Sequence, residues 1–253
     1  MAAPSFRPAS SRARNAAASR TAILEQAIAE FAAQGVAGAR TAAIAEAAGV
    51  NKALLYYYFK DKESLYAASL EAVFSGLVEA LLPLLESALS PGEKLLRFAR
   101  AHFEYLIRHP DYPRLIQQEM SCAGSRGEPS GGFRAISTAH FIPLQRAGMR
   151  AVEQGIASGE LRPVEGAGTL SAVIGMNVFY FISAPIMRAL RGADPFSPRA
   201  RRAHIACSLD FIAAALFTDR RRGITLAKKI AEDSSALPRA PQGKGRKANT
   251  HES

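Results

Sequence analysis

Cysteine is scarce in this 253-residue chain, and the spacings of a metal site are missing. The two cysteines are Cys122 and Cys207, and no HxxxH or CxxC pattern occurs. A secreted domain held by disulfides uses more cysteines in a shorter chain, so that class is excluded. We expect two buried, reduced thiols in a cytosolic protein, with no structural metal and no other cofactor.

Long apolar runs are also missing. No stretch of about 18 residues is both uncharged and wholly apolar, which predicts that no segment spans a membrane. The first 20 residues lack the apolar core of a secretion signal. They are rich in arginine and serine, as transit peptides are, but nothing after them is typical of an organelle enzyme.

Strict alternation of apolar and polar residues is rare, so strands are not expected. Alanine, leucine, glutamate and arginine dominate, and these residues favour helix. The chain is 48% hydrophobic, which allows a sizeable core, and its length permits a small and a larger domain. We therefore predict an all-α fold in two parts.

The features of an enzyme are weak. The sequence has no nucleophile at an evident turn and no glycine-rich phosphate loop. The one acid–base grouping is Glu104 with His102 or His109. We therefore predict that the protein is not an enzyme.

Basic residues outnumber acidic ones at both ends of the chain. The net charge is +10, of which residues 1–20 carry +4 and residues 219–253 carry +5. We expect a disordered basic arm at 1–19 and a disordered basic tail at 219–253, because both are rich in small, polar and charged residues. Basic ends beside a nearly neutral body are common in proteins that approach nucleic acid.

Between these ends, the chain begins with four helices close together. Residues 20–34 place their apolar side chains on one helical face. Thr41, Asn51 and Asp61 are suited to cap the second, third and fourth helices. The second and third helices are too short to be stable alone, so they must pack on the other two. This layout predicts a helix-turn-helix at residues 20–66.

The third of these helices contains three consecutive tyrosines, Tyr56 to Tyr58. Successive residues in a helix are 100° apart, so the three rings cannot share one face. Leu55 and Phe59 are four residues apart and are expected in the core, with Tyr58 between core and rim. Tyr56 and Tyr57 are expected to point outward, away from the core.

The chain resembles the TetR family of bacterial transcriptional regulators. The resemblance depends on Thr41, on the AEAAGV run at 45–50 and on NKALLYYYFKDKESL at 51–65. It implies a helix-turn-helix DNA-binding domain followed by a larger helical domain for effector binding and dimerisation, at 67–218. It also implies a sequence-specific regulator that binds an inverted repeat of double-stranded DNA as a homodimer and is released by a ligand.

The resemblance assigns roles to individual residues of this segment. Thr41, Tyr56 and Lys62 match positions that bind DNA phosphates, which position a protein without reading sequence. Lys52, Ala53 and Tyr57 lie on the face that meets base edges, although for Tyr57 simple surface packing is an equal alternative. The chain departs from the common pattern at Leu54, where a threonine often donates to a phosphate.

The larger domain is expected to contain helices at 91–109, 111–123, 133–158, 166–191 and 198–217, with a kink at Pro143. The last two helices are apolar enough to fill a core or to pair with a second copy. We favour the second copy, because two-fold DNA readers need a partner.

The resemblance implies a small apolar or aromatic effector that enters between these helices. Two candidate lining residues, His140 and Asn177, are polar groups on apolar helices, and each needs a ligand or a neighbour as partner. The candidate lining residues are Phe103, Leu106, Met120, His140, Phe141, Met149, Asn177, Tyr180 and Met187.

One rival reading uses only the basic ends. A protein that coats DNA without sequence preference needs phosphate attraction and no reading helix. In either reading, the arginine-rich segment at 7–20 is suited to lie in a minor groove.

Overall fold

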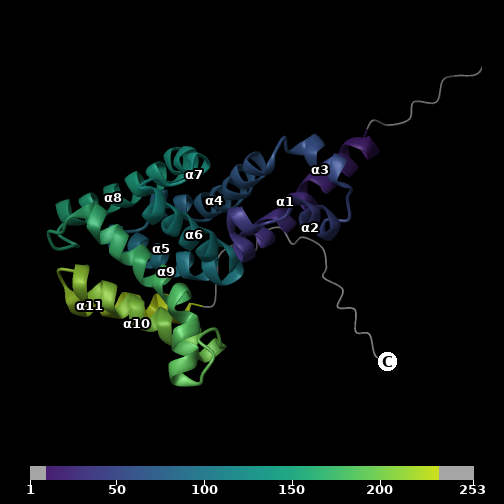
Figure 1. Cartoon of the computed structure of the whole chain (residues 1–253). Coiled ribbons are helices and arrows are strands. Elements are labelled where there is room, and N and C mark those ends of the chain that lie inside the picture. The colour runs from purple at the N-terminus through teal and green to yellow at the C-terminus, as the bar shows by residue number, and fades with distance from the viewer. Residues whose placement is uncertain (1–9, 234–253) are drawn as a thin grey trace, which may run out of the picture.

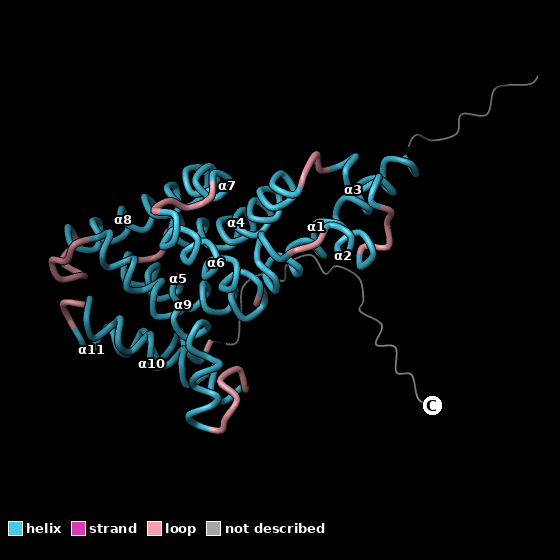
Figure 2. Tube along the Cα trace, viewed as in Figure 1, coloured by secondary structure: helices cyan, strands magenta, loops and turns pink. Residues whose placement is uncertain are grey.

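The computed structural model describes residues 10–233, which form a helical head at one end of a larger helical body (Figure 1). Within this range the side chains of residues 10–14, 122 and 124–126 are not described. The described residues form helices and loops without a strand, as Figure 2 shows. One isolated antiparallel bridge joins Leu161 to Phe217. The all-α fold predicted from the sequence is confirmed.

The head is built from the first three helices and the start of the fourth. These helices are α1 (Ser10–Gly38), α2 (Thr41–Ala47), α3 (Lys52–Tyr58) and α4 (Lys62–Glu86). Helix α1 places Ile23, Ala27 and Phe31 on one fully buried face, at a spacing of four residues. The backbone of α1 bends at Gly35, whose φ of +68° lies in the left-handed region that favours glycine.

Helix α1 corrects the expectation of a disordered arm at 1–19. Residues 10–19 continue α1 toward the N-terminus. Their alanines favour helix, and a helix already formed at residue 20 extends more easily than a new one begins. Residues 1–9, which hold the rest of the predicted arm, lie outside the described part of the chain.

The two short helices of the head have seven residues each and contribute little core of their own. Their largest buried side chains are Ile44 from α2 and Leu55 from α3, with Phe59 just beyond α3. All three belong to the same apolar core as Phe31 of α1, which confirms the prediction for Leu55 and Phe59. The short helices are therefore held by α1 and α4, because a two-turn helix is unstable alone in water.

Two of the three predicted helix caps are confirmed. The Asn51 side chain accepts from the Leu54 amide at 2.8 Å, and Asp61 accepts from the Ser64 amide at 2.7 Å. Hydrogen bonds from Ser64 hold the pKa of the Asp61 carboxyl below its usual value. Thr41 is not a cap: Arg40 holds the N-cap position of α2 in an extended conformation.

The body is a bundle around α5. Its helices are α5 (Pro91–Arg108), α6 (Asp111–Arg126), α7 (Gly131–Ile136), η1 (Ser137–Phe141), α8 (Ile142–Ala157), α9 (Gly166–Arg191), α10 (Pro198–Leu216) and α11 (Arg220–Glu232). Helix α5 contacts α4, α8, α9, α10 and α11. Helix α4 runs from the head into the body, so it belongs to both (Figure 1).

The predicted helix at 133–158 is three segments. A turn of π-helix at Ser137–Phe141 separates α7 from α8. Pro143 stands in the first turn of α8, where its missing N–H leaves no intrahelical bond unmade. The proline therefore starts a helix here, where a kink within one helix was expected.

The C-terminal region also corrects the sequence reading. Residues 220–232 form α11, so the predicted boundary at 218 and the disorder from 219 are wrong for this stretch. Gly223, Ala227 and Ile230 are buried at helical spacing. Arg100 of α5 donates to the carbonyl oxygens of Ile230 and Asp233 at the end of α11. Residues 234–253 lie outside the described range.

Helices α4 and α9 are long and apolar enough to span a membrane by length and composition alone. The sequence criterion passed over them because it required a wholly apolar run, whereas α4 contains Glu71 and Glu79 and α9 contains glycine, serine and Asn177. Of the most apolar window of each helix, 39% is buried in α4 and 28% in α9. In the protein both helices pack within the bundle, and α9 keeps a large exposed apolar surface.

Cys207 on α10 is exposed, which corrects the expectation of two buried thiols. Its neighbours Ser208 and Leu209 turn inward. The expectation for Cys122 falls on a side chain that is not described.

Candidate nucleic-acid interface and effector cavity

The head presents one exposed face of α3 to solvent. Lys52 and Ala53 are exposed, and the exposed fractions of Tyr56 and Tyr57 are 45% and 80%. Leu55 on the opposite side of α3 is fully buried. Helical geometry therefore divides the tyrosine triplet as the sequence predicted, with Tyr58 half-buried between core and surface.

Two hydroxyl groups meet between α2 and α3. Thr41 Oγ1 lies 3.0 Å from the Tyr56 phenol oxygen, and either can be the donor. Whichever of the two hydroxyls donates in this pair, the proton of the other hydroxyl stays free to point outward. Two such groups on neighbouring helices form a small polar clamp that can hold one anionic oxygen.

Lys62 stands at the start of α4, where it joins two elements of the head. Its Nζ donates to the carbonyl oxygen of Ala37 near the end of α1, at 3.2 Å. An ammonium has three protons, so two donors remain for other acceptors. The N-terminus of α4 adds a partial positive charge at the same place.

Arg20 is a residue that the sequence analysis counted in the arginine-rich segment at 7–20 but did not name as a site residue. Its guanidinium carbon lies 5.2 Å from the centre of the Phe59 ring, in a cation–π contact. This contact fixes a positive charge beside α3. The sequence signal was weak, because Arg20 and Phe59 are 39 positions apart.

The predicted effector residues do not line one cavity. Asn177, Phe103 and Tyr180 lie together inside the body, whereas Phe141 borders a separate cavity of about 240 Å³. His140 pairs with Glu71, with 2.7 Å between Nε2 and the carboxylate oxygen. Met120 is 64% exposed. Their role in binding stays a prediction.

Asn177 is buried and fully engaged with its neighbours. Its amide nitrogen donates to the Ala99 carbonyl at 2.8 Å and lies 3.3 Å from His102 Nδ1. Its amide oxygen lies 3.1 Å from His204 Nε2. Burial lowers the pKa of both histidines to about 4, so both are neutral at pH 7. Asn177 therefore ties α9 to α5 and α10, and its polar group has protein partners.

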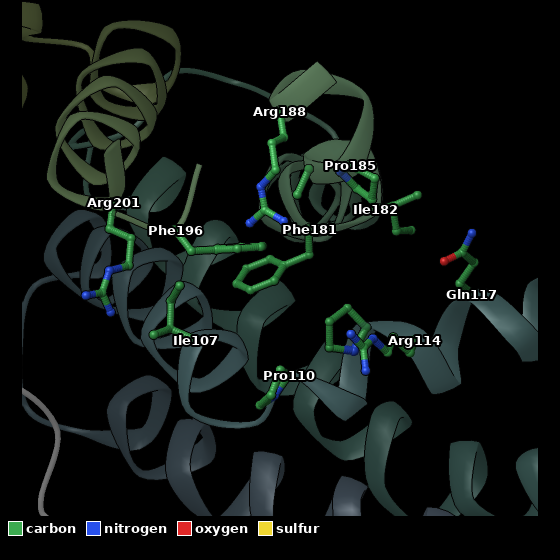
Figure 3. Close-up of a pocket in the computed structure, with 12 residues that line it drawn as sticks. Ile107, Pro110, Arg114, Gln117, Phe181, Ile182, Pro185, Arg188, Phe196 and Arg201 are labelled. Carbon is green, nitrogen blue, oxygen red and sulfur yellow. The ribbon is translucent and has the colours of Figure 1, made fainter. Parts of the chain in front are cut away.

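A cavity of about 400 Å³ opens between α5, α6, α9 and α10 (Figure 3). Phe181 and Phe196 lie in its middle, and Ile107 and the prolines of α6 and α9 add apolar wall. Arg114, Arg188 and Arg201 enter it from three different helices. No periodicity could reveal this site, because its residues converge only when the four helices are packed.

Helix α6 connects this cavity to the head. Arg114 and Gln117 line the cavity, and the next residue, Gln118, donates to the Ala32 carbonyl of α1 at 3.1 Å. The carboxylate of Glu119 is buried and accepts from the Tyr66 hydroxyl of α4 at 2.5 Å. One helix therefore contacts the cavity and both long helices of the head.

Sequence models of known families match both parts of the chain. Residues 23–69 match the model described as bacterial regulatory proteins, tetR family. Residues 91–212 match a tetracyclin repressor-like C-terminal domain. The two matches cover the head and most of the body, in the order seen in the structure.

Curated relatives include two regulators. The HTH-type transcriptional repressor NicS of Pseudomonas putida is 29% identical over 62% of this chain and 66% of its own length, just under two thirds. The HTH-type transcriptional regulator RutR of Escherichia coli is 29% identical over 72% of this chain and 82% of its own.

Solved structures share the fold. The ketosteroid transcriptional regulator KstR2 of Mycobacterium tuberculosis superposes with a TM-score of 0.61 at 22% identity, covering 79% of this chain and 95% of that one. AibR in complex with isovaleryl coenzyme A and operator DNA gives 0.55 at 21% identity, covering 65% and 86%. With the matched head and body, these findings show that the chain belongs to the TetR family of transcriptional regulators.

Proposed function

We propose that this protein is a repressor that binds an inverted-repeat operator as a homodimer in the bacterial cytoplasm and is released by a small effector. The observation that carries the proposal is the Thr41–Tyr56 hydroxyl pair on the exposed face of the head. Relatives named as a repressor and a regulator support the regulatory role and speak against an enzyme. The AibR title, which names both a ligand and operator DNA, supports the two-site arrangement.

In this proposal Thr41, Tyr56 and Lys62 bind DNA phosphates and set the depth of α3 in the major groove. Lys52, Ala53 and Tyr57 then face base edges. The Lys52 ammonium can donate to guanine, and the Ala53 methyl group can contact thymine. Tyr57, 80% exposed, has the reach to contact bases or sugar.

Dimerisation uses the exposed apolar side of α9 and α10. Phe179, Ile186 and Leu190 are 60–73% exposed and lie on one face, because they are spaced by seven and four residues. Phe211 of α10 is 64% exposed. A patch of this kind is typical of an isologous interface, in which the same residues from two copies meet.

Release requires an effector that prefers the conformation unable to fit DNA. The cavity beside α6 is placed for this, because Gln118 and Glu119 on the same helix hold α1 and α4. A shift of α6 moves the head of each subunit and changes the spacing of the two α3 helices.

The alternative, a non-specific coat held by basic ends, loses part of its basis. Five of the nine basic residues in 219–253 belong to α11, which is packed on α10. Figure 1 places α11 at the far end of the body from α2 and α3. The other four lie outside the described residues.

Selection from sheared genomic DNA followed by nuclease footprinting tests the function. We expect a few fragments to be retained, each protected over two symmetry-related half-sites about one or two helical turns apart. Retention should fall steeply with salt, because phosphate contacts release counterions. Equal, weak retention of all fragments would favour the non-specific coat.

The phosphate clamp is tested on a selected fragment by fluorescence anisotropy. We expect Tyr56→Phe to weaken binding about tenfold, since a hydrogen bond to a charged group is lost. Lys62→Ala should also make the slope of affinity against salt shallower by about one per subunit. Lys60→Ala is the matched control, because Lys60 is exposed and lies two positions before Lys62. Thermal melting of each variant shows whether the head is still folded, so that a lost DNA contact can be told from unfolding. A Tyr56→Phe variant that melts and binds DNA like wild type would reject the clamp.

The dimer is tested by sedimentation velocity. Phe179→Glu and Phe211→Glu each place a charge in the proposed interface, and we expect monomers at micromolar concentration. Met120→Glu is the control, because Met120 is as exposed as Phe211 but lies on α6. Unchanged mass in both phenylalanine variants would place the interface elsewhere.

A further inference from the structure

We infer that the cavity between α5, α6, α9 and α10 binds an organic carboxylate with an apolar aromatic or aliphatic body. This deepens the proposed function, since it rests on the same effector site and names the class of ligand. The inference comes from the arginines of the cavity, their incomplete pairing and the apolar wall between them.

The arginines outnumber their acidic partners. Arg188 pairs with Asp194 at 2.7 Å, and its hydrogen bond lowers the pKa of that carboxyl. Arg114 lies 3.7 Å from Asp111. For Arg201, the ion pairs of the described residues include no carboxylate. The site therefore has a net positive charge.

The paired arginines remain available to a ligand. The side chains of Arg188 and Arg114 are 60% and 62% exposed, so their ion pairs are solvated and weak. Figure 3 shows Arg188 extending toward Phe181 and Phe196, with Arg201 on the other side of Phe196. A guanidinium fork matches the two oxygens of a carboxylate, and the aromatic rings shield that pair from water.

The same arrangement disfavours other ligands. A cation is repelled by three guanidinium groups. A neutral ligand adds no counter-charge to Arg201, which has no ion pair among the described residues and feels only the longer-range charge of Asp194. A volume of about 400 Å³ suits one aromatic ring or a short alkyl chain attached to the acid.

The other cavities lack this combination. The cavity of about 850 Å³ between α5, α10 and α11 is lined by both acids and bases, and its Arg100 already binds Glu104 and α11. The cavity of about 240 Å³ beside Phe141 has no charged residue in its lining.

The dimer proposed above leaves open the cavity lined by Arg114, Arg188 and Arg201, here called the arginine cavity. Phe181, Ala184 and Arg188 line the cavity at a spacing of three and four residues. Helical rotation places them about 180° from Phe179, Ile186 and Leu190. A second copy on that apolar face therefore covers the side of α9 that faces away from the ligand.

Thermal-shift and calorimetric titrations of the full chain test the inference. The probes are benzoate, phenylacetate and octanoate, each compared with its primary amide, and phenyl phosphate. We expect at least one acid to raise the melting temperature while its amide does not. Arg201→Gln and Arg188→Gln should each weaken that acid about tenfold or more. Arg202→Gln is the matched control, because Arg202 is the next residue on α10 and lines only the 850 Å³ cavity.

Three results would overturn the inference: no acid that stabilises more than its amide, binding unchanged in both cavity variants, or stabilisation by phenyl phosphate alone. These titrations contain no DNA. A failure here therefore leaves the operator-binding proposal standing, and a failure of DNA selection leaves the carboxylate site standing.

Discussion

The structure depends on the packing of two short helices against two long ones. Helices α2 and α3 have seven residues each and cannot persist alone. Phe31 of α1 and Leu65 of α4 are fully buried in the core that also holds Ile44 and Leu55. Whatever moves α1 or α4 therefore moves the exposed face of α3, because α2 and α3 share their buried core with those two helices.

Helix α6 gives that constraint a functional meaning. It holds α1 through Gln118 and α4 through Glu119, while Arg114 on the same helix enters the arginine cavity. The cavity and the reading surface are thus parts of one packed network, with α4 common to the head and the body. Two-state coupling between ligand and DNA needs a contiguous element of this kind, together with a ligand that distinguishes the two states.

Local sequence was sufficient for the head and insufficient for the body. Asn51 and Asp61 are caps because their neighbours in sequence are the helices they cap, and the outward angle of Tyr56 follows from helical rotation alone. Thr41 was misread as a cap because its partner Tyr56 is 15 positions away.

Helix α11 was missed because its charges outweigh Ala227 and Ile230, which are buried only through α5 and α10. The arginine cavity could not be foreseen, since Arg114 and Arg201 line one cavity only when their helices are packed. Asn177 was rightly singled out as a polar group that needs a partner, and the partners are two neutral histidines.

One thermodynamic cycle tests whether α6 couples the cavity to DNA binding. DNA affinity is measured with and without a saturating carboxylate, in wild type and in Gln118→Ala, which breaks the contact with α1 and leaves the cavity lining intact. We expect the acid to weaken DNA binding by wild type, and to weaken DNA binding by Gln118→Ala much less although the variant still binds the acid. Equal weakening in both proteins would contradict it, and would show that the signal reaches the head without α6.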